Sequence, residues 1–349
     1  MVWLTLAACT PEAARFLVVD GREGEYDLVE REIPELTDPG RMRGELGDGA
    51  MGGNITIDGG VLGAVLSGEE EVDLIYVGGR PIRLDYTVTD GLAVPLDPDG
   101  VTLWSYYHTL SSARQQLDAL GIDIEPVFPV PFSWAPTMPL QAGVSENAAY
   151  VAGGLHRFML LPDPGGARLP LAASPMVIRH ELGHAVFQLV VFGGPLEVDL
   201  DLAYPRMRDL NEGFADILAT LLLDDPDVLG SVFASSIAEP RLVDVPGRTL
   251  TMGFEDPYLA GNGIATFAWD IRVATGDPGA TLVMAVEALE LWADLDLSSE
   301  EDDDGVLLAR YGELLVDRVA ATRPDVLPTV CEAYAVRFFD YAEASACGG

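Results

Sequence analysis

The segment RHELGHAVFQ, residues 179–188, constrains this chain most, because it places His180 and His184 four residues apart on a predicted helix. Residues i and i+4 lie on one face of an α-helix, so both imidazoles can reach one metal ion. Glu181 lies beside them, displaced toward the open side of that metal. Two histidines on a helix can also be surface residues, but the chain holds only 4 His and apolar residues flank this pair. Imidazole nitrogens favour zinc, which catalytic sites hold through three protein ligands and a water molecule.

A second helix is predicted in RDLNEGFADILATLLL, residues 208–223, and it offers the third ligand. Glu212 and Asp216 share one face of this otherwise apolar segment. Burying an unpaired charge is costly, so two acids here need a cationic partner, which a zinc ion and its histidines supply. Glu212 is then a zinc ligand, and Asp216 accepts a hydrogen bond from the other ring nitrogen of His180. The alternative is a solvated acidic face. Gly183 is expected to leave space beside the metal.

The order of predicted elements indicates an α+β fold, with strands first and helices afterwards. Short runs separated by glycine turns predict strands before residue 97, and Ser174 with Pro175 predicts the start of a helix. Helices are expected at 101–120, 176–192, 208–224, 262–275, 279–293, 305–322 and 325–344. The turn-like sequence LDPDG marks a boundary between a small β-rich domain at 10–97 and a larger domain at 98–349. Residues 1–9 are expected to form a signal of the lipoprotein type.

The charge of the chain excludes some partners. Its 349 residues carry 56 acidic and 20 basic side chains, all of the latter Arg, for a net charge of −36. Such a surface repels nucleic acid and anionic membranes, so we expect no nucleic-acid partner. The charge suits salty surroundings, although the absence of Lys can equally reflect a GC-rich genome.

Two patterns of cysteine bear on location. Leu6-Ala7-Ala8-Cys9 resembles a bacterial lipobox, in which Cys9 is lipidated, although the apolar stretch before it is short and lacks a basic start. The alternative is an apolar strand with a buried Cys9. If Cys9 carries a lipid, Cys331 and Cys347 remain as an even pair. They are expected to form a disulfide in an exported protein, or otherwise to stay as buried thiols. We therefore expect a secreted or envelope-anchored bacterial protein whose membrane contact is limited to that lipid.

The two helix motifs, HELGH and NEGFAD, together resemble the gluzincin metallopeptidases, especially the thermolysin-like and fungalysin-like branches. The resemblance covers about residues 100 to 275. It implies a thermolysin-like zincin catalytic domain with a strand-rich upper half and a helical lower half, preceded by the small β-rich domain. It also implies that ENAAYVAGG is an edge strand, with Asn147 and Ala148 pairing with the backbone of a peptide substrate.

The function that the resemblance implies is zinc-dependent hydrolysis of peptide bonds by an endopeptidase, in which Glu181 activates a zinc-bound water. The family has a further His before the segment GNGIATFAWDI, yet no His follows His184 here. The matching stretch FEDPYLAG offers Tyr258 as a neutral donor to the oxyanion, or else as a packed loop aromatic. His156 and His108 are weaker candidates for that role. The alternatives are a catalytically weak or inactive peptidase-like surface lipoprotein that binds zinc or peptide, and a different zinc hydrolase.

Overall fold

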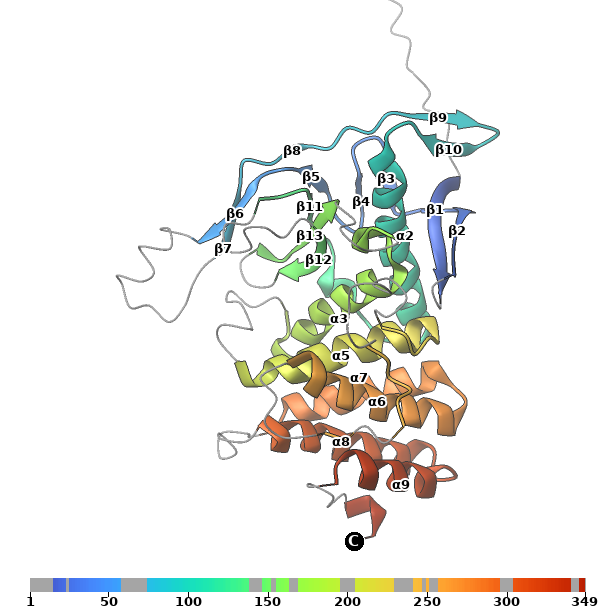
Figure 1. Ribbon diagram of the computed structural model, residues 1–349, viewed down its shortest axis with the longest axis vertical. Helices are drawn as coiled ribbons and strands as arrows, with labels where there is room; N and C mark the ends of the chain where they lie inside the picture. Colours follow the sequence, from blue (N-terminus) through green and yellow to red (C-terminus); the bar gives the residue numbers. More distant parts are fainter. Residues whose placement is uncertain are drawn as a thin grey trace, which may run out of the picture.

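The protein, seen here in a computed structural model, separates into a strand-rich half and a helical half (Figure 1), which confirms the predicted α+β class. The structure describes residues 15–22, 25–57, 74–137, 146–151, 155–162, 169–194, 205–228, 241–246, 249–250, 257–295, 304–339 and 345–348. The lipobox prediction at Cys9 lies outside these residues. None of the helices in the described part of the chain has the length and apolar composition needed to cross a membrane.

Two larger sheets form the strand-rich half. Their orders are β2-β1-β10-β9 and β12-β13-β11-β5-β8, and two-stranded pairs join β3 to β4 and β6 to β7. The strands are β1 (Arg15–Arg22), β2 (Glu25–Arg31), β3 (Leu36–Asp38), β4 (Arg43–Gly44), β5 (Gly49–Met51), β6 (Asn54–Ile57), β7 (Leu74–Val77), β8 (Arg80–Pro81), β9 (Tyr86–Thr89), β10 (Leu92–Pro95), β11 (Phe132–Trp134), β12 (Glu146–Val151) and β13 (Arg157–Pro162).

The strands before residue 97 share a sheet and a core with elements later in the chain. Strand β5 pairs in parallel with β11. The Phe16 ring packs edge-on against Trp104 with centroids 5.2 Å apart, and the Tyr107 hydroxyl accepts a hydrogen bond from the Leu46 amide at 3.0 Å. The predicted β-rich unit at 10–97 is therefore joined to the larger unit by strand pairing, by aromatic packing and by buried hydrogen bonds.

The helical half follows the predicted periodicity. Its helices, with the long helix that lies among the strands, are α2 (Pro98–Ala119), α3 (Pro175–Phe192), α5 (Pro205–Leu223), α6 (Pro257–Thr275), α7 (Pro278–Ala293), α8 (Asp304–Thr322) and α9 (Leu327–Arg337). Ser174 caps α3 by accepting from the Val177 amide at 3.4 Å, which confirms the predicted start of that helix. Most predicted boundaries lie within three residues of those observed, and two differ by more. Helix α6 begins at Pro257, before the expected residue 262, because proline suits the first helical turn, and α9 ends at Arg337.

Glycines bring the three central helices into backbone contact. A Cβ at Gly183 of α3 would lie 2.5 Å from the Ala215 Cα of α5, so the expectation that Gly183 opens space beside a metal was wrong. The missing side chain lets α3 approach α5. On the other side of α5, a Cβ at Gly213 would lie 2.6 Å from the carbonyl oxygen of Gly261 in α6. These contacts fix the relative positions of the side chains that α3, α5 and α6 present close to the three glycines.

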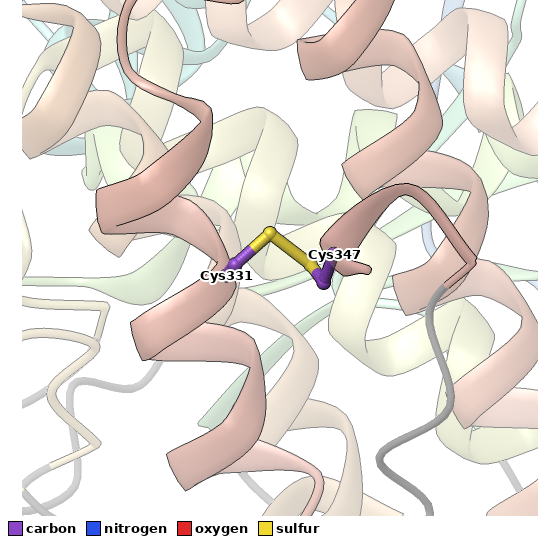
Figure 2. Close-up of a disulfide and its surroundings, with 2 residues drawn as sticks. All are labelled: Cys331 and Cys347. Carbon is purple, nitrogen blue, oxygen red and sulfur yellow. A yellow bond between two sulfur atoms is a disulfide. The ribbon is translucent and has the colours of Figure 1, made fainter. Parts of the chain in front are cut away.

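A disulfide joins Cys331 of α9 to Cys347 in the short 3-10 helix η5 (Ser345–Cys347), with Cα atoms 5.5 Å apart (Figure 2). The two residues are separated by 16 positions in the sequence. The bond attaches the described end of the chain to the outermost helix of the helical half (Figure 1).

Gly183→Ala is expected to lower stability by about 1–3 kcal/mol, because the added methyl group meets backbone atoms that cannot rotate away. Gly263→Ala is the matched control, since its Cβ would meet the flexible end of Leu250 at 3.4 Å, and alanine favours the helix. Thermal unfolding measures both variants. Equal melting temperatures for Gly183→Ala and the unchanged protein would contradict the close approach of α3 and α5.

Candidate active site

The rings of His180 and His184 converge at the contact between α3 and α5. Their Nε2 atoms lie 3.2 Å apart. The Glu212 Oε2 atom of α5 lies 3.4 Å from the first of these nitrogens and 3.9 Å from the second. Helix α3 supplies both rings because i and i+4 share a face, and the close approach at Gly183 brings α5 near enough to add the carboxylate.

This triangle of atoms fits a zinc ion. Zinc bonds to imidazole nitrogen at about 2.0–2.1 Å, so neighbouring ligand atoms of a tetrahedral site lie about 3.3–3.4 Å apart. The measured separations are 3.2, 3.4 and 3.9 Å. His180, Glu181 and His184 also form a compact group of potential ligand atoms, all within 4.8 Å of one another. The site is therefore compatible with zinc binding.

The outer nitrogen of each ring has an acceptor that fixes its tautomer. The Nδ1 of His180 donates to Asp216 Oδ1 at 2.9 Å, and the Nδ1 of His184 donates to Asn211 Oδ1 at 3.0 Å. With Nδ1 held as the donor, Nε2 is the nitrogen of each ring that a metal can bind. The structure thus brings Asp216 to its predicted place, and it adds Asn211, which the sequence reasoning missed.

Arg241 is the second residue that sequence reasoning missed. It is largely buried, and its guanidinium contacts Asp216 Oδ2 at 2.8 Å and Glu212 Oε2 at 3.4 Å. Its Nε also donates to Asp216 Oδ2 at 2.9 Å. Although burial alone lowers the pKa of Arg241, the two carboxylates raise it overall. Arg241 therefore pairs with both acids of α5.

The charges of the cluster favour a divalent cation. Glu181, Glu212 and Asp216 are buried, and Arg241 together with a protonated His180 offsets two of their three negative charges. Burial lowers the pKa of His180, but hydrogen bonds to Asp216 and Glu212 outweigh it and raise that pKa to about 10. Burial raises the pKa of Glu212, yet His184, His180 and Arg241 bring it down to about 2. At neutral pH and without a metal, His180 therefore carries a proton that a zinc ion bound at its Nε2 would replace.

Glu181 lies on α3 facing the edge strand β12. Its Oε2 accepts a hydrogen bond from the Tyr150 amide at 2.6 Å, and burial raises its pKa above the usual range. Strand β12 lies at the end of its sheet, with Asn147 opposite Leu161 and Ala148 opposite Leu160 of β13. The predicted edge strand therefore passes beside the carboxylate, and among the described strands only β13 pairs with it.

Tyr258 lies in the first turn of α6 rather than in a loop. Its ring lies beneath the Arg241 guanidinium at 4.7 Å, and 44 % of the residue is exposed. The negative charge of Glu212, followed by burial, raises its pKa to about 12. The phenol is therefore protonated at neutral pH, near the acids of the cluster and open to solvent.

The two remaining histidines are engaged elsewhere. His156 receives a hydrogen bond at Nδ1 from the Tyr150 hydroxyl at 2.7 Å, and its Nε2 donates to the Val127 carbonyl at 2.8 Å. His108 lies on α2, where Asp20 and Arg179 act on it. Tyr258 is thus the candidate of the three that lies against the site's own residues.

Comparison with solved structures identifies the fold. The chain is similar to the precursor of protealysin, a metalloproteinase from Serratia proteamaculans, with a TM-score of 0.53 and 13 % sequence identity. The match covers 74 % of this chain and 82 % of that chain. No family model and no curated protein matches the sequence. The likeness confirms the predicted thermolysin-like fold, within which a His-Glu-His group of the H-E-x-x-H pattern lies on a buried helix.

Asp216→Ala is expected to weaken zinc binding by about 10–100-fold, because His180 loses the acceptor that orients it. Asn211→Ala is the matched comparison: it removes the acceptor of His184 without changing charge, so we expect a smaller loss. Competition with a zinc chelator measures both affinities. A folded Asp216→Ala variant that binds zinc as tightly as the unchanged protein would show that this hydrogen bond does not orient a ligand.

Proposed function

We propose that this protein is a zinc-dependent endopeptidase that hydrolyses peptide bonds. The observation that carries the proposal is the triangle of His180 Nε2, His184 Nε2 and Glu212 Oε2, with Glu181 beside it. These three residues would hold the metal. A bound zinc ion polarises a carbonyl group and lowers the pKa of water toward 7. Every other task falls to side chains and backbone groups of this chain.

Glu181 is the general base in this proposal. Its carboxylate takes the proton of the attacking water and returns it to the leaving amine. The Tyr150 amide holds Oε2, so the second carboxylate oxygen is directed by a fixed backbone group. Burial raises the pKa of Glu181, which brings its basicity closer to that needed for proton transfer at neutral pH.

The substrate is an extended peptide that adds to the edge of β12. Its backbone groups pair with those of Asn147 and Ala148, as an extra antiparallel or parallel strand would. Since the Tyr150 amide of the same strand contacts Glu181, a peptide bound along β12 lies beside the general base. A nucleic-acid substrate is disfavoured by the net charge of −36.

Tyr258 is the donor that stabilises the oxyanion of the tetrahedral intermediate. Its position at the start of α6 is fixed relative to Glu212 by the contact between Gly213 and Gly261. A pKa of about 12 keeps its proton in place at neutral pH. Arg241 packs on its ring and so limits the directions in which the hydroxyl can point.

The second candidate function is that of a peptidase-like protein that binds zinc or peptide with little turnover. The absence of any His after His184 favours it. The intact pair of Glu181 and its amide donor favours the enzyme.

In either case we propose that the protein is exported to the bacterial envelope and lipidated at Cys9. A mature N-terminus elsewhere, found by mass spectrometry in the native host, would contradict this proposal.

Glu181→Gln is expected to keep one zinc per chain and to lose hydrolysis by about a hundredfold or more, because the amide cannot accept the proton. Glu212→Ala is expected to lose most of the zinc, since only two ligands remain. A peptide library assayed with and without chelator, beside metal analysis, measures both. Glu290→Gln, on an exposed helix position, is the control. Full activity in Glu181→Gln would remove Glu181 from the mechanism.

Tyr258→Phe is expected to lower kcat by about a hundredfold, because one preorganised donor to the oxyanion is lost. Zinc content and melting temperature should stay unchanged, since the ring still packs on Arg241. Tyr86→Phe, in the β2-β1-β10-β9 sheet, controls for loss of a phenol elsewhere. Unchanged kcat in Tyr258→Phe would mean that another group donates the hydrogen bond that stabilises the oxyanion.

A further inference from the structure

Helix α2 carries a polar stripe on the face that it turns toward β1 and α3. Ser105, His108 and Ser112 recur at i, i+3 and i+7, which places them on one side of the helix. The Ser105 hydroxyl accepts from the Val19 amide of β1 at 2.7 Å. The Ser112 hydroxyl accepts from Arg179 of α3 at 3.2 Å. We name this region, lined by Asp20, Arg31, Ser105, His108, Ser112 and Arg179, the polar seam.

Arg179 is a buried cation without a contacting acid. Only 5 % of the residue is exposed. Its Nη1 donates to the Pro175 carbonyl and its Nη2 to Ser112, both at 3.2 Å, while the buried Nε has no partner. Throughout the described residues, no carboxylate lies within 4.0 Å of its guanidinium. A buried charge in this state is costly unless a counter-charge is supplied.

Asp20, the acid whose charge influences Arg179, already accepts hydrogen bonds from other groups. Asp20 influences Arg179 electrostatically, but its Oδ2 accepts from Arg31 at 2.6 and 3.1 Å, and its Oδ1 accepts from the Gly21 amide at 2.9 Å. Glu35, which also acts on His108, accepts from Ser111 and Gln115. With Asp20 paired to Arg31, no acid of the polar seam is in contact with Arg179.

His108 adds a second buried donor. Its Nδ1 atom is buried and has no hydrogen-bond partner. Burial lowers the pKa of His108 to about 4, so the ring is neutral at pH 7 and can donate one proton without adding charge. Arg179 and His108 act on one another electrostatically and lie on helices that contact each other. Each of these two buried N–H groups, on helices that contact each other, requires an acceptor.

We propose that the polar seam binds one small monovalent anion of the halide class, held by Arg179 Nε and His108 Nδ1. Such an ion accepts from both donors and offsets the charge of Arg179, whereas a water molecule can accept from them but carries no charge. The site lies on a different side of α3 from the candidate metal ligands, because successive helix residues are rotated by about 100° and Arg179 contacts Ser112 of α2. It does not rest on the proposed peptidase function.

The test compares thermal unfolding of the full chain in sodium chloride and in sodium gluconate, at equal ionic strength and constant pH. Chloride should raise the melting temperature saturably, by roughly 3 °C or more, because it binds the folded state only. Gluconate is a much larger anion than chloride and serves as the reference salt. Bromide should act as chloride does. Identical melting temperatures in all three salts would overturn the proposal.

Two variants identify the site. Arg179→Met removes the charge and should abolish the difference between chloride and gluconate, whereas Arg318→Met, which removes an Arg paired with Glu287, should keep it. If Arg179→Met does not fold, the variant Ser112→Asp tests the same assignment. It places a carboxylate where the Ser112 hydroxyl now accepts from Arg179, so the protein itself supplies the counter-charge. This variant should be as stable in gluconate as the unchanged protein is in chloride. A chloride response that survives in Ser112→Asp would contradict the assignment.

Discussion

The packing of α3 against α5 is the interaction on which the candidate site depends. Glycine at position 183 lets the two backbones approach until His180 and His184 face Glu212 and Asp216. These four ionisable side chains then share a buried space, in which Arg241 contacts both acids. Buried charges are stable only when they are paired, and a metal ion bound by the histidines would be a further partner for these acids. The same contact that stabilises the helical half therefore builds the metal-binding geometry.

The second support of the site comes from parts of the chain that lie far away in sequence. Arg241 reaches Asp216 and Glu212 from beyond α5, and β12 contributes the Tyr150 amide to Glu181. Helix α6 adds Tyr258 against Arg241. Each group is held by at least one contact that a change of helix packing would alter. The geometry beside the histidines is thus a property of the whole interface between sheet and helices.

The residues that could be predicted from the sequence are those whose relative positions depend on helical spacing alone. His180 with His184, and Glu212 with Asp216, are pairs at helical spacing within apolar segments, so their convergence needed only two helices in contact. Residues such as Arg241 could not be placed, because the chain between α5 and this arginine has no periodic signal. The requirement that two buried acids need cationic partners was assigned to a zinc ion and its histidines, so it did not point to this arginine. The role of Asn211 had a clearer signal, since it directly precedes Glu212 in the second motif.

The β12 edge strand was predicted from a resemblance. The contact between the Tyr150 amide and Glu181 could not be predicted, because every residue except proline has a backbone amide and the sequence does not show which one is the donor. The start of α6 was misplaced for a different reason. Glycines at 261 and 263 weakened the helical pattern, whereas in the structure Gly261 allows the contact with α5. Arg179 was passed over because it is adjacent to the histidine motif, although it faces α2 rather than α5.

The central claim is that two histidines and one glutamate of this chain bind zinc. Zinc X-ray absorption on the purified full-length protein, combined with metal analysis, tests it most directly. The account predicts one tightly bound zinc per chain, with imidazole nitrogens at about 2.0–2.1 Å and oxygen ligands, and no sulfur. Loss of one imidazole in His184→Ala should be visible in the same spectrum. A protein that retains no zinc, or a spectrum with sulfur or without imidazole, would contradict the account.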